Sequence, residues 1–288
     1  MSDLRPRRSV LYMPAANERA LDKTKTIPSD ALIFDLEDAV SPDSKPDARR
    51  NAVAAATSGE YGQREITIRC NALSTQWGSD DITAAATSGV AAVVIPKINS
   101  VAEVDAVSAV LAKAGAPDSM TIWAMIETPT AIFDVRAIAA HPRVATLVMG
   151  TNDLAKELRA TQIDGRAPLL PHLATALLAA RESDKVILDG VFNDVKDLDA
   201  FRSECVQGAT MGFDGKTLIH PSQVEIANDV WAPTSDEVDY AQRVIAAFEE
   251  ASAEGRGVIS VDGRMIENLH VDNARRVLAV QKAIDELT

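Results

Sequence analysis

The stretch Ala31-Leu32-Ile33-Phe34-Asp35-Leu36-Glu37-Asp38 changes abruptly from an apolar run to a group of carboxylates. Its apolar part has the length of a buried strand, and the carboxylates follow where that strand is expected to end. The same change recurs along the chain, because other short apolar runs also end in polar or charged residues. These further ends are Arg69-Cys70-Asn71, Pro96-Lys97, Glu127-Thr128-Pro129, Gly150-Thr151-Asn152-Asp153, Asp189-Gly190 and Phe213-Asp214-Gly215-Lys216.

The apolar runs alternate with longer amphipathic runs, which predicts alternating strands and helices. The predicted strands are Ser9–Pro14, Ala31–Leu36, Glu65–Asn71, Ala92–Lys97, Thr121–Glu127, Thr146–Gly150, Val186–Phe192 and Ala209–Phe213. The predicted helices are Asn17–Thr26, Pro46–Thr57, Ser79–Ser88, Val101–Lys113, Ala131–Ala139, Leu169–Glu182, Val195–Glu204 and one after Pro221. This pattern favours an α/β fold, a (β/α)₈ TIM barrel, whose polar strand ends meet on one face. An open doubly wound sheet is the alternative, but the chain has no glycine-rich dinucleotide motif.

The pattern changes near residue 232, which divides the chain into a predicted barrel over 1–232 and a C-terminal helical extension over 233–288. The extension is predicted to contain a helix over Ser235–Gly255, a β-turn segment over Gly257–Gly263 and a last helix over Ile266–Leu287. It has an apolar face but little mass, so we expect no core of its own. A lid over a barrel mouth, most simply a neighbouring subunit's, is its predicted role.

Composition narrows the classes of function. The 288 residues carry a formal net charge of −13, which argues against a nucleic-acid partner. The two cysteines, Cys70 and Cys205, exclude a disulfide scaffold and favour a reducing compartment. The chain shows no signal-peptide pattern and no apolar stretch long enough to span a membrane, so a cytoplasmic protein without a membrane partner is expected.

Glu127 and Asp153 end the fifth and sixth predicted strands, which are neighbours in a barrel. Two carboxylates brought together repel each other unless a cation or a proton holds them. An all-oxygen ligand set suits Mg²⁺, with Mn²⁺ as a second possibility. Two alternatives stay open: Asp153 as the N-cap of a following helix, and a metal-free carboxylate dyad.

Arg69 ends the third predicted strand, and its planar fork suits a carboxylate or a developing enolate oxygen. Alternation along a strand places Asp35 and Glu37 on one face, so Glu37 is predicted to support Arg69. Asp38 is predicted to lie in the loop near the metal. A purely structural ion pair between Arg69 and Glu37 or Asp38 is the competing interpretation.

A cationic group formed by Arg19, Lys23 and Lys25 follows Tyr12 in the sequence. Tyr12 offers a stacking face and the cations offer partners for phosphate, so together they suit a nucleotide-like group. A solvated helix face is an equally good interpretation of this group.

These residues together resemble a known family. The runs Arg8-Ser9-Val10-Leu11-Tyr12-Met13-Pro14 and Asp30 to Val40 are similar to those of the citrate lyase β-subunit-like (CitE-like) family, which includes malyl-CoA lyases and belongs to the HpcH/HpaI aldolase superfamily. The resemblance continues in Ile68-Arg69-Cys70-Asn71, Ile126-Glu127-Thr128-Pro129, Gly150-Thr151-Asn152-Asp153-Leu154 and Ile219-His220-Pro221-Ser222-Gln223. It runs almost from end to end of the chain and in the expected order.

The resemblance implies a TIM barrel, a Mg²⁺ ion, acyl-CoA substrates and a homotrimer. By position, Glu127 and Asp153 are implied metal ligands, and Arg69 is implied to hold the substrate's carbonyl oxygen. Tyr12 and Lys23 are implied CoA contacts, and Arg19 and Glu127 are predicted to bind substrate beside them. In the lyases a tail aspartate acts as acid or base in a neighbouring site, and here Glu267 stands at that position.

The predicted function is therefore Mg²⁺-dependent cleavage or formation of the carbon–carbon bond of a malyl-CoA-type 3-hydroxyacyl-CoA. The products of cleavage are an oxoacid such as glyoxylate and acetyl-CoA or propionyl-CoA. Arg69, Glu37, Asp38 and Glu267 are the predicted catalytic residues. Because Glu267 replaces an aspartate, hydrolysis of the thioester to malate and CoA carries nearly equal weight. A non-catalytic or complex-dependent subunit of citrate-lyase type is a third interpretation.

Overall fold

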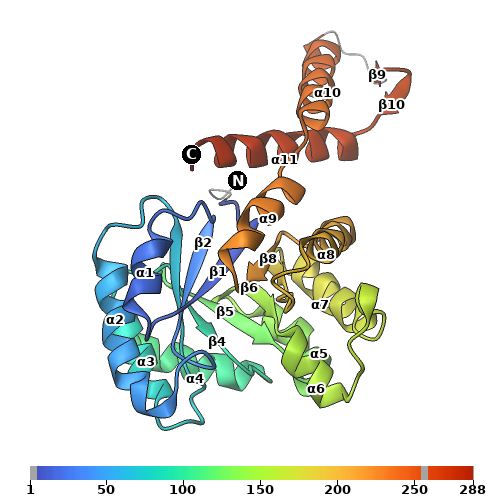
Figure 1. Ribbon diagram of the computed structural model, residues 1–288. Helices are drawn as coiled ribbons and strands as arrows, with labels where there is room; N and C mark the ends of the chain where they lie inside the picture. Colours follow the sequence, from blue (N-terminus) through green and yellow to red (C-terminus); the bar gives the residue numbers. More distant parts are fainter. Residues whose placement is uncertain (1–4, 254–258, 288) are drawn as a thin grey trace. The chain divides into compact units, whose positions relative to one another are not determined.

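The computed structural model describes residues 5–253 and 259–287. Eight parallel strands close into a barrel in chain order (Figure 1). The strands are β1 (Ser9–Pro14), β2 (Ala31–Asp35), β3 (Glu65–Arg69), β4 (Ala92–Ile95), β5 (Thr121–Ile126), β6 (Val144–Met149), β7 (Val186–Asp189) and β8 (Gly215–Leu218). β8 pairs with β1, with Val10 opposite Thr217. The closed ring confirms the predicted TIM barrel and excludes the open sheet.

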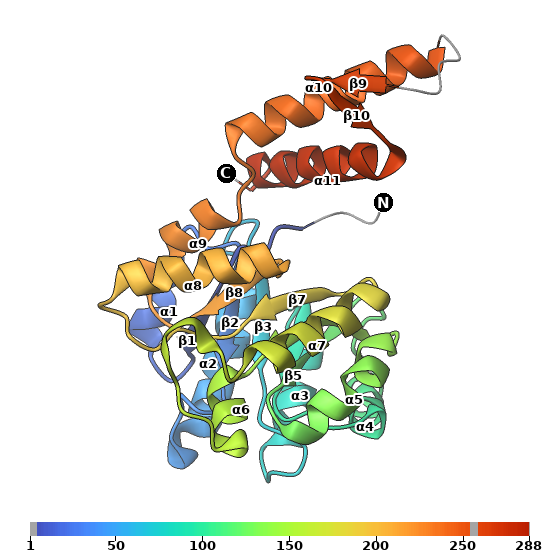
Figure 2. The ribbon, with the colours of Figure 1, turned by 90° about the vertical axis from the view of Figure 1, so that its right-hand side faces the viewer.

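Helices connect the strands and lie outside them, as Figure 2 shows. The α-helices are α1 (Glu18–Thr24), α2 (Lys45–Thr57), α3 (Gly78–Ala86), α4 (Val101–Lys113), α5 (Pro129–Ala140), α6 (Thr151–Leu158), α7 (Leu170–Glu182), α8 (Leu198–Met211) and α9 (Val224–Val230). Short 3₁₀ helices are η1 (Pro42–Ser44), η2 (Asp164–Arg166) and η3 (Pro221–Gln223). Side-chain caps fix several starts, since Asn17, Ser100, Thr128 and Asp197 each accept a backbone N–H of the first turn.

Alternate residues of each strand face the interior of the barrel, because successive side chains on a strand point to opposite sides. The interior is apolar and includes Val10, Ile33, Trp123, Met125 and Val148. Continuing the same alternation to the carboxyl ends of the strands brings polar residues to the mouth. Tyr12, Asp35, Arg69 and Glu127 thus share the inward face with the apolar core below them.

The predicted eighth strand, Ala209–Phe213, is wrong. Helix α8 continues to Met211 and ends at Gly212, whose φ of 107° is in the left-handed region. The true strand β8 follows and contains Lys216, which is fully buried. The four residues of β8, Gly215-Lys216-Thr217-Leu218, contain no apolar run, which is the feature by which the other strands were predicted. Helix α6 is absent from the predicted helices and was considered only through the alternative in which Asp153 caps a helix.

Lys216 faces the helices rather than the barrel interior. On that side it is buried among charged residues. Its Nζ lies 2.9 Å from Asp189 Oδ2 and 2.8 Å from Glu204 Oε1. Arg166 Nη1 donates to both oxygens of Asp189, at 2.7 and 3.0 Å. We call Arg166, Asp189, Glu204 and Lys216 the outer cluster.

The contacts divide the chain into one unit over Arg7–Val230 and a second that contains the chain from Trp231 onward. The second unit consists of α10 (Ser235–Ala253), the hairpin strands β9 (Ile259–Val261) and β10 (Arg264–Ile266), and α11 (Asn268–Asp285). The predicted turn segment began at Gly257, which lies outside the described residues.

The second unit buries an apolar cluster that includes Val244, Val261, Ile266, Val271 and Ala274. The expectation that this part of the chain has no core of its own is therefore wrong, because the hairpin and both helices contribute to one cluster. None of the described helices is both long and apolar enough to cross a membrane.

Candidate active site

A cavity of about 440 Å³ opens at the carboxyl ends of the barrel strands. This volume is within the range of small-molecule sites. The lining comes from β1, β2, β3, β5, β6 and β8, from the loops that follow β2, β5, β7 and β8, and from the start of α6. It includes Tyr12, Pro14, Asp35, Asp38, Arg69, Met125, Glu127, Gly150, Asn152, Asp153, Asn193 and Thr217.

Arg69 is held at the mouth by two carboxylates. Its Nε and Nη2 donate to the two oxygens of Asp35 at 2.7 and 2.6 Å, and Nη1 lies 2.8 Å from Glu37 Oε2. Its guanidinium lies over the ring of Tyr12, 4.7 Å from the centroid. Burial by itself would lower the pKa of Arg69, but Asp35 raises it and keeps the group charged. Asp35 takes two of the five N–H donors and Glu37 takes a third, which leaves two for a ligand.

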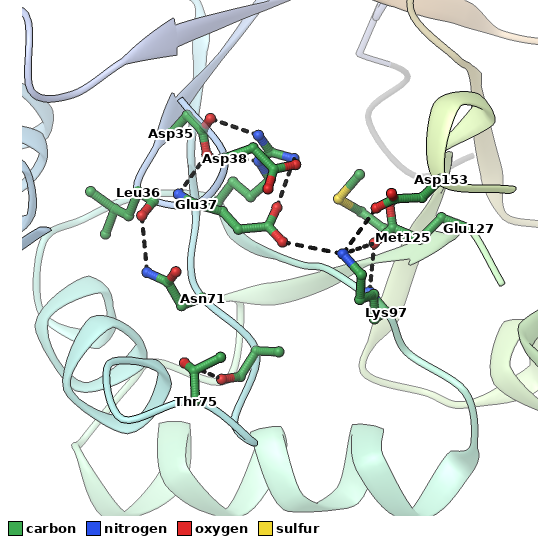
Figure 3. A network of polar contacts seen from close by, with 12 residues as sticks. Asp35, Leu36, Glu37, Asp38, Asn71, Thr75, Lys97, Met125, Glu127 and Asp153 are labelled. Carbon is green, nitrogen blue, oxygen red and sulfur yellow. Dashed lines mark hydrogen bonds and ion pairs between the residues drawn. The ribbon is translucent and has the colours of Figure 1, made fainter. Parts of the chain in front are cut away.

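Lys97 is a second cation at the mouth, and it lies among carboxylates from three strands' ends. Its Nζ is 2.9 Å from Asp153 Oδ2, 3.6 Å from Glu37 Oε1 and 3.9 Å from Glu127 Oε1. Figure 3 shows the lysine between Glu37 on one side and Glu127 and Asp153 on the other. Sequence analysis predicted Lys97 at a strand end but gave it no role. The carboxylates at the other strand ends could have indicated that this lysine belongs to the site.

Glu127 is the most deeply buried of the three carboxylates around Lys97, at 3% exposure. Burial raises its pKa to about 7, and Lys97 opposes that increase. The backbone N–H of Lys97 donates to Glu127 Oε1 at 2.8 Å. Gly150 makes room for the carboxylate, because a Cβ there would lie 2.3 Å from Glu127 Oε2. Only glycine fits at that point of the β6–α6 connection.

The groups joined by these contacts carry more negative than positive charge. The carboxylates Asp35, Glu37, Asp38, Glu127 and Asp153 outnumber the two cations, Arg69 and Lys97, so a formal charge of −3 gathers at the mouth. A divalent cation would reduce this charge. In the described ranges, 5–253 and 259–287, no three His, Cys, Asp or Glu side chains form a metal cage. Two carboxylates are nevertheless enough for Mg²⁺, which keeps waters and takes further ligands from substrate.

Asp153 is in the first turn of α6, whose N-cap residue is Gly150. The alternative that Asp153 itself caps the helix is therefore wrong. Asp38 is 70% exposed and lies 3.7 Å from Arg69, on the cavity lining. Its predicted place near the metal remains a prediction, and Glu37 is the member of this pair that lies beside Lys97.

The predicted nucleotide-binding cations lie on and after α1. Arg19 and Lys23 are exposed, and neither lines the cavity. Lys25 is paired with Asp22 at 2.8 Å and with Glu60 at 2.7 Å. Only Tyr12 of the predicted CoA contacts therefore lines the cavity itself.

Glu267 belongs to the second unit, where it is the N-cap residue of α11. Its backbone N–H donates to His270 Nδ1 at 3.0 Å. This position is the one expected of a helix-capping carboxylate. Its predicted acid or base role remains a prediction.

Comparison with known families matches residues 8–221 to the HpcH/HpaI aldolase/citrate lyase family. The chain belongs to this family. The match covers the whole barrel from β1 to β8, including every residue that lines the cavity, and it confirms the resemblance found in the sequence.

Relatives from this family match over nearly their full length. A (3S)-malyl-CoA thioesterase of Cereibacter sphaeroides is 48% identical over 97% of this chain and 96% of its own. The citrate lyase subunit beta of Escherichia coli is 36% identical over 96% of this chain and 93% of its own. The crystal structure of CitE from Mycobacterium tuberculosis with magnesium, acetoacetate and coenzyme A has a TM-score of 0.77. It is 26% identical and is matched over 97% of this chain and 100% of its own. These names denote enzymes, which confirms the prediction of an enzyme.

Proposed function

We propose that the protein is a Mg²⁺-dependent hydrolase of a malyl-CoA-type 3-hydroxyacyl-CoA, releasing a free 3-hydroxy acid and CoA. The observation that carries the proposal is the 48% identity, over almost the whole chain, to a (3S)-malyl-CoA thioesterase. This choice reverses the order of the two activities predicted from the sequence, because that identity exceeds the 36% shared with the citrate lyase subunit beta.

Glu127 and Asp153 are the residues that would hold the metal. Their carboxylates both lie beside Lys97 Nζ, and the excess of negative charge at the mouth suits a divalent ion. The CitE structure of Mycobacterium tuberculosis was solved with magnesium and coenzyme A, which supports the same cofactor and a CoA substrate here. When bound, Mg²⁺, or Mn²⁺ in its place, would orient and polarise the oxygens of the hydroxy acid.

Arg69 is proposed to stabilise the oxyanion that forms when water attacks the thioester carbonyl. Asp35 and Glu37 fix the guanidinium in advance, so its free N–H donors need no rearrangement as charge develops. The C–S bond then breaks, and CoA leaves as a thiol after protonation. Asp38, exposed beside Arg69, and Glu267 are the proposed sources of proton transfer.

Carbon–carbon cleavage is the second candidate, because the position of Arg69 suits it as well as it suits hydrolysis. The same donors that stabilise a tetrahedral oxyanion also stabilise a thioester enolate, which is the leaving fragment in that reaction. A base would take the proton of the 3-hydroxyl group, the bond between carbons 2 and 3 would break, and the enolate would be protonated. The products would be an oxoacid and a shorter acyl-CoA.

Three further parts of the proposal concern recognition and assembly. Tyr12 is proposed to contact the CoA part of the substrate, with Arg19 and Lys23 at its phosphates. The chain is proposed to form a homotrimer in which the second unit covers a neighbour's mouth. We further propose that the enzyme is cytoplasmic and has no nucleic-acid or membrane partners.

Products separate the candidates. Purified protein is incubated with malyl-CoA and Mg²⁺, and free thiol and glyoxylate are measured separately. Thiol with malate supports hydrolysis, whereas glyoxylate with acetyl-CoA and no thiol supports the lyase. Neither product would support a complex-dependent subunit. Glu127→Ala and Asp153→Ala should abolish the metal-dependent reaction, while Asp134→Ala, at an exposed carboxylate on α5, should not change it.

A further inference from the structure

Lys97 occupies an unusual place for a lysine. Its ammonium group lies within 4 Å of Glu37, Glu127 and Asp153, two of which are the proposed metal ligands. The side chain is 44% exposed, so it is not locked in place by packing. The ammonium group thus supplies positive charge among the carboxylates of the mouth, and packing does not prevent the side chain from moving away from them.

The backbone of Lys97 is also unusual. Its φ of 52° is in the left-handed region, which a residue with a side chain adopts only at a cost. This conformation coincides with the hydrogen bond from the Lys97 N–H to Glu127 Oε1. Strain of this type persists where surrounding structure enforces it, commonly at functional sites. One residue thus orients a proposed ligand with its backbone and contacts both ligands with its side chain.

We propose that Lys97 is a positioning residue that couples metal binding to substrate binding. Without metal its ammonium group holds the place of the ion among Glu37, Glu127 and Asp153. An arriving divalent cation displaces the ammonium from Asp153 and Glu127. The side chain then pairs with the free carboxylate of a hydroxy acid that the metal chelates. This inference rests on the proposed metal site.

A simple structural ion pair predicts something different. An exposed pair of this type contributes little to stability. Its ammonium group would oppose a cation by charge repulsion but would have little effect on an anion that it does not contact. The proposed role instead requires opposite effects on two ligands: removing the ammonium should strengthen metal binding and weaken binding of the anionic ligand. A general loss of positive charge would act in the same two directions from any place on the protein, so a lysine far from the mouth has to serve as the control.

The experiment measures binding rather than turnover. Mn²⁺ binding to Lys97→Met, Lys97→Gly and wild type is followed by calorimetry, with Lys113→Met as the control. Lys113 is an exposed lysine in the last turn of α4, so its replacement removes the same charge from the chain at another place. Removing a unit charge so close to the ion should tighten Mn²⁺ binding at least about tenfold in both Lys97 variants. Glycine adopts the left-handed backbone conformation readily, so Lys97→Gly should keep the N–H hydrogen bond to Glu127. This variant therefore distinguishes the effect of the side chain from that of the backbone.

Malate is then titrated into each protein at saturating Mn²⁺. We expect at least about tenfold weaker binding to both Lys97 variants, the scale of one lost charge-assisted contact, and no change in Lys113→Met. Unchanged Mn²⁺ affinity in the Lys97 variants, with wild type binding normally, would overturn the inference and leave the proposed function intact. Failure of wild type and variants alike to bind Mn²⁺ would overturn the metal site itself. Tighter Mn²⁺ binding with unchanged malate binding, or no malate binding by wild type, would overturn the coupling.

Discussion

Two clusters of charged side chains lie in the same barrel and differ in net charge. This difference distinguishes a cluster that stabilises the fold from one that is proposed to bind a ligand. The outer cluster, between β7, β8 and α8, sets Arg166 and Lys216 against Asp189 and Glu204. Positive and negative charges are equal, and Asp189 and Lys216 are fully buried. Burial alone would raise the pKa of Asp189, but Lys216 and Arg166 lower it below its usual value.

The cluster at the mouth has the opposite character. Five carboxylates face two cations, and burial raises the pKa of both Glu37 and Glu127. Charge that is not neutralised by neighbours destabilises the folded state. Such charge is commonly found at functional sites, where a ligand of opposite charge neutralises it. Buried charge alone therefore does not mark a functional site. Buried charge that neighbouring residues do not neutralise does mark one.

The largest effect that tests this contrast is the loss of Lys216. Lys216→Met leaves the buried Asp189 and the part-buried Glu204 facing Arg166 alone, so we expect a loss of about 3–5 kcal/mol in the free energy of unfolding. Denaturant titration measures it. Lys97→Met removes the corresponding cation from the mouth, where exposure limits the loss to about 1 kcal/mol or less.

A double variant sharpens the interpretation. Lys216→Met with Glu204→Gln restores equal charge in the outer cluster and should be more stable than Lys216→Met alone, with a coupling of about 0.5–3 kcal/mol. Simple addition of the two single losses would show that lost packing, rather than charge balance, explains the cluster.

The next effect compares two arginines. Arg69→Lys keeps the charge and loses the fork, so turnover should fall at least about a hundredfold, as when one oxyanion donor is removed. The same substitution in the outer cluster, Arg166→Lys, breaks its bonds to Asp189 and Gln207. It should lower stability without changing turnover per folded molecule. Near-native turnover in Arg69→Lys would instead make this arginine a structural partner of Asp35.

The barrel could be predicted from the sequence because most of its strands are apolar runs that end in charged residues. β2 is the clearest case, since Ala31–Asp35 is buried throughout and is followed, after Leu36, by Glu37 and Asp38. β8 could not be found in this way. Its Lys216 is buried only because Asp189 and Glu204 lie beside it, and sequence order does not show which distant residues will neutralise a lysine.

Part of the site could be predicted for a related reason. Alternation along β2 and β3 correctly brought Asp35, Glu37 and Arg69 together. The role of Lys97 was not predicted, because Lys97 and Asp153 are far apart in the sequence. Their contact also depends on the left-handed backbone conformation of Lys97 after β4. Lysine gives no local sign of such a conformation, which is usually a property of glycine or asparagine.

The smallest effect uses pH to distinguish the clusters. Burial holds the pKa of Glu127 near 7, above its usual 4.5. In metal-free protein the folded state therefore keeps a proton that the unfolded chain has released. Stability should fall as pH rises from about 4.5 to 7, by an amount on the order of 2 kcal/mol. Asp189 acts in the opposite sense, because its lowered pKa contributes stability above its usual value of 3.8 that is lost as pH falls further.

Denaturant titrations in chelator across pH 4.5–8 measure the slope. Glu127→Gln cannot titrate, so we expect it to flatten the decline and to be more stable than wild type at pH 8. Asp134→Asn, at an exposed position on α5, should keep the wild-type slope. Saturating Mg²⁺ should also flatten the decline in wild type, because a bound ion favours the ionised carboxylate. If Glu127→Gln declines with pH as steeply as wild type, the proton is held elsewhere, and the imbalance at the mouth does not act through Glu127.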